Sequence, residues 1–224
     1  MTTSDKGDRQ ARARELNEEA SKVARTGDLA SALALFEESL RLKGEIKDIE
    51  GIAATLAMRA QALAAADKDI YGTRAIAEVR QAEALLTRVG AWFDVARAAM
   101  IHIHIAASLG SYKETRRAAA TGAVAAMHNE DEETCGEMLR WVVEASMKMD
   151  EPLNDHLVDI AIIAARFGGV DQIEYIQPVI VLAMEALGLD PSEAPARAVG
   201  LMKDLEDDRL RAWLDPLLES YAHA

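Results

Sequence analysis

Apolar residues at helical spacing in residues 17–42 predict two helices joined by a short turn. The apolar positions are Ala20, Val23 and Ala24 in the first half and Ala32, Leu33, Phe36 and Leu40 in the second half. Between the halves Gly27 interrupts the pattern, and Asp28 opens the second run. The stretch is therefore predicted to form one helical hairpin.

The same pattern continues along the chain and predicts three more hairpins. The expected helices cover residues 8–25, 29–43, 49–66, 72–88, 92–109, 112–128, 130–149 and 152–167. The turns inside the four hairpins, at Gly27, Asp67, Gly110 and Met149, are separated by 40, 43 and 39 residues. Spacing this regular is typical of a repeat, in which each hairpin buries its apolar face against the next one.

The two ends of the chain depart from this pattern. Residues 1–6 offer nothing to bury and are expected to be disordered, so the four hairpins are placed in residues 7–167. Residues 168–224 contain helical runs that follow the repeat only weakly. We expect them to cap the stack as part of the same domain.

Three local features are predicted where helices meet. The segment from Asp67 to Gly72 is expected to form a longer turn than the one at Gly27. Ser111 with Glu114 and Asn129 with Glu132 have the three-residue spacing of a capping box, in which the two side chains satisfy free amides at a helix start.

Composition narrows the class of protein. Half of the residues are hydrophobic but only 4% are aromatic, which favours many thin, closely packed helices. The formal net charge of −13 argues against nucleic acid as a partner, because phosphate binding needs clustered basic residues. A basic or neutral protein surface fits better, although a strongly acidic balance also serves solubility alone. The single cysteine and the absence of a long apolar run lead us to expect a cytoplasmic protein without a membrane partner.

The first hairpin resembles a tetratricopeptide repeat. Leu16 and Ala20 stand at the packing positions of the family's first helix, Gly27 and Asp28 at its turn, and Ala32, Phe36 and Leu40 on its second helix. The 39- to 43-residue intervals are similar to the longer variants of this family. The resemblance implies an all-α fold, an α-solenoid of stacked antiparallel helical hairpins that forms a right-handed, tetratricopeptide-like superhelix.

The resemblance also implies a concave groove lined by the first helix of each hairpin. Its candidate partner-binding residues are Arg14, Asn17, Ser21, Gln61, Arg97, Met100, His104, Leu139, Arg140 and Val143. Met100, Leu139 and Val143 are expected to contact apolar side chains of a partner, while the polar members orient it in a slightly basic groove. The alternative is that the polar members are ordinary solvated side chains.

No motif indicates catalysis, a cofactor or a metal ion. His102 and His104 lie ~200° apart on a helix, so they cannot share an ion, and we expect His104 in the groove and His102 at a hairpin interface. The acidic run 129–133 suits a helix start, and Cys135 is expected to be a small buried residue. The sequence has no zinc-binding HExxH pattern and no glycine-rich phosphate loop.

The sequence therefore predicts a non-catalytic protein-protein interaction module, an adaptor or scaffold that holds a peptide or helix of a partner protein. Two alternatives stay open. One is an oligomeric scaffold that self-associates through its uncapped end or its leucine-rich last helix. The other is a small-ligand sensor or enzyme with a pocket near His102 or His104.

Overall fold

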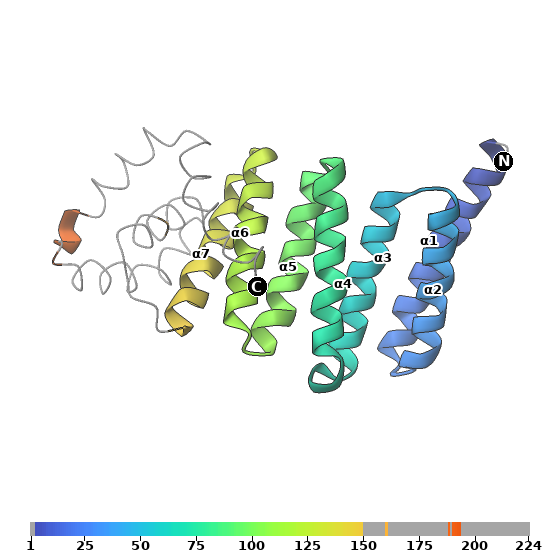
Figure 1. The fold of residues 1–224 in the computed structure, drawn as a ribbon, viewed down its shortest axis with the longest axis horizontal. Helices are drawn as coiled ribbons and strands as arrows, with labels where there is room; N and C mark the ends of the chain where they lie inside the picture. Colours follow the sequence, from blue (N-terminus) through green and yellow to red (C-terminus); the bar gives the residue numbers. More distant parts are fainter. Residues whose placement is uncertain (1–2, 150–159, 161–187, 189, 194–224) are drawn as a thin grey trace. The chain divides into compact units, whose positions relative to one another are not determined.

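The computed structural model describes residues 3–149, 160, 188 and 190–193. Within these residues the chain is all-α, and no strand occurs. The helices are α1 (Thr3–Arg25), α2 (Leu29–Glu45), α3 (Ile49–Ala66), α4 (Lys68–Val89), α5 (Trp92–Ser108), α6 (Tyr112–His128) and α7 (Glu132–Lys148), followed by the short 3-10 helix η1 (Pro191–Glu193) (Figure 1). The predicted all-α class is confirmed for these residues.

The chain divides into two compact units, an N-terminal unit (Met1–Gly110) and a C-terminal unit (Ser111–Ala224). In the N-terminal unit each helix packs against the one that follows it, from α1 to α5. In the C-terminal unit α6 packs against α7. The expected helix 152–167 and the expected capping segment 168–224 lie almost entirely outside the described residues.

Aspartate caps begin three helices of the N-terminal unit. Asp28 accepts a hydrogen bond from the amide of Ser31 at 3.1 Å, and Asp48 accepts one from Gly51 at 2.9 Å. Asp67 accepts from the amides of Asp69 and Ile70. Each cap satisfies amides that have no partner inside the helix, and it places negative charge at the positive end of the helix dipole.

The cap at Asp67 corrects the prediction of a long turn up to Gly72. Asp67 is extended, with φ −163° and ψ 105°, and this one residue joins α3 to α4. Gly72 lies inside α4, where a Cβ atom would stand 2.7 Å from the methyl carbons of Leu109. The glycine therefore allows the close approach of α4 to the end of α5.

Two further boundary predictions are corrected. Helix α1 begins at Thr3, within the segment expected to be disordered, and Arg9 on this helix pairs with Asp5 and with Glu45 at the end of α2. Ser111 is the N-cap of α6 but its side chain makes no capping hydrogen bond, and Glu114 pairs with Arg117.

The start of α7 also differs from the prediction. Its N-cap is Asp131, which accepts a hydrogen bond from the amide of Thr134 at 3.0 Å, whereas Asn129 ends α6. Glu130 lies between them with a positive φ of 55° and so completes the turn. The acidic run does serve a helix start, since Asp131 caps α7 and Glu132 and Glu133 lie in its first turn.

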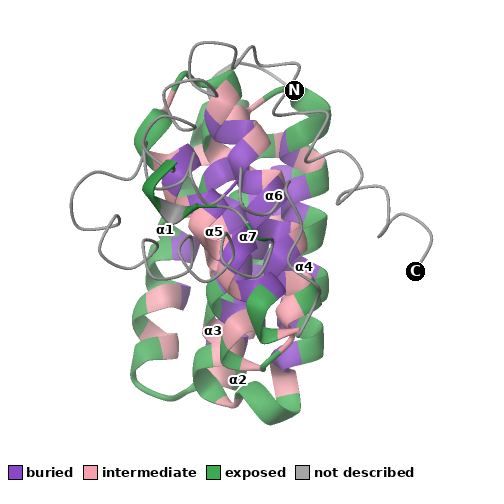
Figure 2. Cartoon of the chain, turned by 90° about the vertical axis from the view of Figure 1, so that its left-hand side faces the viewer, coloured by how far each residue is buried: buried purple, intermediate pink, exposed green. Residues whose placement is uncertain are grey.

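The core of each unit lies along the helix faces that meet. Exposed positions run along the outer sides of the helices in Figure 2, and buried positions lie where helices face each other. The largest fully buried side chains of the N-terminal unit are Phe36, Leu63, Val79, Val95, His102 and Ile103. In the C-terminal unit six buried alanines of α6 face a core that includes Met138 and Leu139 of α7. Small side chains let these helices approach closely.

Candidate functional site

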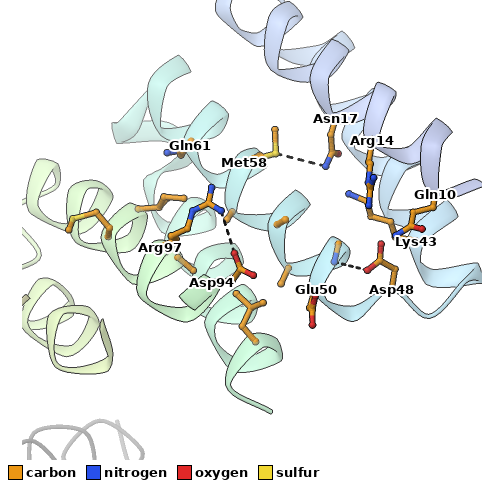
Figure 3. Close-up of a pocket in the computed structure, with 18 of the residues that line it drawn as sticks. Gln10, Arg14, Asn17, Lys43, Asp48, Glu50, Met58, Gln61, Asp94 and Arg97 are labelled. Atoms are coloured by element: carbon orange, nitrogen blue, oxygen red, sulfur yellow. Dashed lines mark hydrogen bonds and ion pairs between the residues drawn. The ribbon is translucent and has the colours of Figure 1, made fainter. Parts of the chain in front are cut away.

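A groove of about 720 Å³ lies on the N-terminal unit, over α3 and between α1 and α5. These are the first helices of the three predicted hairpins that begin in this unit. The described lining residues are Gln10, Arg14, Asn17, Lys43, Asp48, Glu50, Gly51, Ala53, Ala54, Ala57, Met58, Gln61, Leu86, Asp94, Arg97, Ala98, Met100, Ile101 and His104. Figure 3 shows Arg14 and Asn17 on one side of α3 and Arg97 on the other.

The floor of the groove is made of small side chains. Ala53, Ala54 and Ala57 come from α3, and Ala98 comes from α5. Ala54 is exposed, whereas the other three are buried. Methionines 58 and 100 border this floor, and their flexible thioether side chains adapt to varied apolar surfaces.

The lining residues recur at the spacing of the predicted repeat. Ala54 lies 40 residues after Arg14, and Arg97 lies 43 residues after Ala54. The same intervals relate Asn17 to Ala57 and Met100, and they relate Gln61 to His104. Equivalent positions of α1, α3 and α5 therefore face the same groove.

A buried polar network joins α1, α2 and α3 at one side of the groove. The Thr55 hydroxyl accepts hydrogen bonds from Asn17 Nδ2 at 2.9 Å and from Lys43 Nζ at 2.6 Å. Its own proton can go to the carbonyl of Gly51 at 2.9 Å or to Asn17 Oδ1 at 3.2 Å. Buried polar groups in such a network specify one arrangement of the three helices, since any partner lost would leave the others unsatisfied.

Lys43 is the charged member of this network and is only 3% exposed. Burial lowers the pKa of its ammonium group to about 8. The negative charge of Asp48 acts in the opposite direction and raises this pKa, while the positive charge of Arg14 lowers it. Lys43 and Arg14 therefore form a close pair of like charges (Figure 3).

The other charged groups of the groove are mostly occupied. Arg97 pairs with Asp94 at 3.4 Å and lies over the ring of Phe93, 6.0 Å from its centroid. Asp48 caps α3. With Glu50, the described lining contains three basic and three acidic side chains besides His104, so the groove is balanced in charge and not slightly basic as the sequence indicated.

The structure brings six of the ten candidate residues together at this groove. These are Arg14, Asn17, Gln61, Arg97, Met100 and His104. Asn17 is buried in the polar network, so it shapes the wall from within. Ser21 is not among the described residues that line the groove, and its hydroxyl donates to the carbonyl of Asn17 at 2.9 Å along the same helix.

The remaining three candidates belong to the C-terminal unit. Leu139 and Val143 are buried in α7, so they offer no surface to a partner. Arg140 pairs with Glu144 on the same helix and lies over Trp141, 5.0 Å from the ring centroid. The predictions for Leu139 and Val143 are corrected because the inward face of α7 carries apolar residues that pack, whereas the role of Arg140 stays a prediction.

Sequence reasoning missed Lys43, Asp48, Glu50 and Asp94 as groove residues. Lys43 carried a usable signal, because it lies seven residues after buried Phe36 and therefore on the same face of α2. The three acids stand at the starts of α3 and α5, where acidic residues commonly serve the helix start.

His102, His104 and Cys135 lie where the sequence predicted. His104 is exposed in the groove, and fully buried His102 bonds through Nδ1 to Glu83 of α4 at 2.9 Å, at a helix interface. Cys135 is buried in α7. No cluster of three or more metal-ligating side chains occurs among the described residues.

No protein-family model matches the chain, and no curated protein matches it in sequence. None of the described helices has an apolar stretch of the length that crossing a bilayer requires. The groove is therefore interpreted from its own geometry and chemistry.

Proposed function

We propose that the chain is a non-catalytic protein-binding module, an adaptor or scaffold of the cytoplasm, whose groove over α1, α3 and α5 holds a peptide or helix of a partner protein. The observation that carries this proposal is the groove itself. One continuous surface is lined by equivalent positions of three helices and combines a floor of alanines with polar side chains along its edges. This combination suits a segment with both apolar and polar groups.

The exposure of the rim favours a macromolecular segment over an enclosed small molecule. Arg14, Gln61, Arg97 and His104 are all exposed and reach the groove from three different helices. Sites for small ligands generally bury most of the ligand in a concave pocket with few polar groups. An open groove of this kind instead accepts a chain that enters and leaves at its ends.

The fold part of the proposal is a tetratricopeptide-like α-solenoid. Its support is the recurrence of groove positions at intervals of 40 and 43 residues, together with sequential packing of α1 to α5. A regular stack of this kind presents the first helix of every hairpin on one side. An experimental structure of the whole chain tests this arrangement directly.

Binding is tested with a variant that fills the groove. Because Ala54 is exposed on the floor, Ala54→Trp places an indole in the groove without entering the core. Ala84→Trp on α4 is the matched control, since Ala84 is exposed and does not line the groove. Random peptides selected on the immobilised full chain are measured by fluorescence anisotropy against both variants.

We expect selected peptides to lose at least about tenfold in affinity on Ala54→Trp and to bind Ala84→Trp as they bind the unmodified chain, because an indole blocks the floor. Circular dichroism confirms that both variants fold. Peptides that bind both variants equally, or a selection that yields no peptide, would contradict the proposal.

A further inference from the structure

The outward face of α4 carries basic side chains with no exposed acid beside them. Between positions 73 and 88 the exposed residues all share one side of the helix (Figure 2). They are Thr73, Arg74, Ala77, Arg80, Gln81, Ala84, Thr87 and Arg88. Arginine occurs at three of these positions and no acidic residue occurs among them. This face is therefore positively charged, in a chain whose net charge is −13.

The two glutamates in the middle of α4 face the interior, which explains the charge of its surface. Glu78 is 7% exposed and is shared by Arg59 at 2.7 Å and Arg74 at 2.9 Å, so one carboxylate meets two positive charges. Glu83 is 3% exposed and lies 2.9 Å from Nδ1 of His102. Neither acid reaches Arg88, which forms no hydrogen bond or ion pair with any described residue.

The outward face of α2 has the opposite arrangement. Its exposed Arg41 pairs with Glu38 at 2.6 Å and with Glu45, both on the same helix. Pairs three or four residues apart are the ordinary way in which charges on a solvated helix neutralise one another. The face of α4 lacks this internal neutralisation, so it can be neutralised by acids from another molecule.

We propose that the outward face of α4, from Thr73 to Arg88, binds an acidic α-helix of a partner protein. None of its eight exposed residues lines the groove, so this surface is separate from the one in the proposed function. Arg74, Gln81 and Arg88 recur every seven residues along about 21 Å of helix. A partner helix with carboxylates at the same seven-residue spacing would pair with both arginines at once.

The side chains between the arginines allow such a helix to lie close. Ala77 and Ala84 are exposed and short, and side chains of this size let two helix axes approach to about 8–10 Å. Charge supplies the attraction and orients the partner, while the short side chains supply the contact area.

Charge also favours an acidic helix over nucleic acid or a second copy of this face. Double-stranded DNA carries one charge for about every 1.7 Å of its axis, far more than three arginines along the helix can neutralise. The acidic balance of the whole chain would repel it further. Two copies that met through this face would place arginines against arginines.

The test selects helical peptides on the full chain from two libraries with the same randomised contact positions. The flanking positions, spaced every seven residues, are Glu in one library and Lys in the other. Affinities of the binders are measured by fluorescence anisotropy at low and high salt. The variants are Ala84→Trp, which places an indole in the middle of the face, and the double variant Arg80→Gln with Arg88→Gln.

Two further variants are controls. Ala54→Trp fills the groove and leaves α4 unchanged. Arg12→Gln removes an exposed arginine of α1 that pairs with Glu15 and lies outside α4. Circular dichroism confirms that every variant folds.

We expect binders from the Glu library that lose at least about tenfold in affinity on Ala84→Trp and on the double arginine variant. High salt should weaken them, because the attraction is between exposed charges. Both controls should bind them as the unmodified chain does.

A Glu library without binders, or binders that Ala84→Trp leaves unaffected, would overturn the proposal. Binding of a DNA duplex of about 20 base pairs that the double arginine variant abolishes would assign the face to phosphate groups instead. Self-association of the chain in light scattering, lost on Ala84→Trp, would assign it to a second copy. The groove is judged separately, since its peptides should respond to Ala54→Trp and not to Ala84→Trp.

Discussion

Positions that the predicted repeat makes equivalent are exposed to the groove in one unit and buried in the other. Met100 and His104 of α5 line the groove, and the residues 39 positions later on α7 are Leu139 and Val143, which are buried. The side chains explain the difference in part. Arg14, Gln61, Arg97 and His104 of the N-terminal unit are polar and exposed, whereas Leu139 and Val143 of α7 are apolar and buried. Repeat spacing therefore predicts which face of a helix a residue occupies, but not whether that face is open.

Shortening the side chains of Leu139 and Met100, which the predicted repeat makes equivalent, should give the largest difference in stability. Leu139→Ala should lower the free energy of unfolding by about 2–5 kcal/mol, since it leaves a cavity in a packed core. Met100→Ala should cost less than about 1.5 kcal/mol, because this half-buried side chain borders open space. Urea denaturation followed by circular dichroism measures both. Equal losses would show that the two positions share one environment.

A pH dependence should also separate the units. The folded-state pKa of Lys43 is about 8, below its ordinary value of 10.5, so the unfolded chain binds more protons between these values. The free energy of unfolding should therefore rise with pH from about 8 to 10.5, by at most about 3 kcal/mol. At each pH we take the free energy of unfolding of the unmodified chain minus that of Lys43→Met. This subtraction cancels the titration of other groups.

The matched control for this experiment is the buried arginine of the C-terminal unit. Arg116 is 8% exposed and hydrogen bonds Ser146 at 3.4 Å, and a guanidinium group does not deprotonate in this range. The difference in the free energy of unfolding between the unmodified chain and Arg116→Met should therefore not change over the same pH range. A flat profile for Lys43→Met too would contradict the assignment of a lowered pKa to Lys43.

A smaller effect is expected from two threonines that differ in their partners. Thr55→Val leaves Asn17 and Lys43 without their shared hydroxyl and should cost about 1–3 kcal/mol. Thr121 in α6 bonds only to the carbonyl of Arg117 on its own helix among the described residues, so Thr121→Val should cost less than about 0.5 kcal/mol. Thermal unfolding of the two variants measures both costs. A cost for Thr55→Val as small as that for Thr121→Val would mean that the network contributes little.

The smallest effects should come from the partly exposed ion pairs of each unit. Asp94→Asn removes the pair with Arg97, and Glu144→Gln removes the pair with Arg140. Each should change the free energy of unfolding by less than about 1 kcal/mol, because solvent screens such pairs. A larger loss for Asp94→Asn, measured at low and high salt, would indicate that the pair also shapes the groove.

Much of the fold follows from the sequence because helix boundaries have local causes. Gly27 and the aspartates at positions 28 and 48 mark turns and caps that the structure contains. The start of α4 was missed because one extended residue, Asp67, suffices to reverse the chain, and Gly72 then serves contact with Leu109, not a turn. That contact joins residues far apart in sequence, which periodicity does not report.

The spacing of the predicted repeat located part of the candidate site. Counting along the repeat located the side chains of Arg14, Gln61, Arg97 and His104. It did not find Lys43, which comes from the second helix of its hairpin and reaches the groove wall through its long aliphatic stem. Nor did it separate buried Asn17 from its exposed neighbours, because burial depends on Thr55 and Lys43, which lie on other helices.

The exposed alanine in the floor of the groove has a consequence for how this surface changes over evolutionary time. Ala54 touches the groove but stays out of the core, so mutations there escape the strong selection that folding imposes on neighbouring Ala53 and Ala57. Under the proposed function, larger side chains at this one position would exclude some bound segments and admit others at little cost in stability. Duplicated copies of the chain have in Ala54 a simple route to divergent specificity.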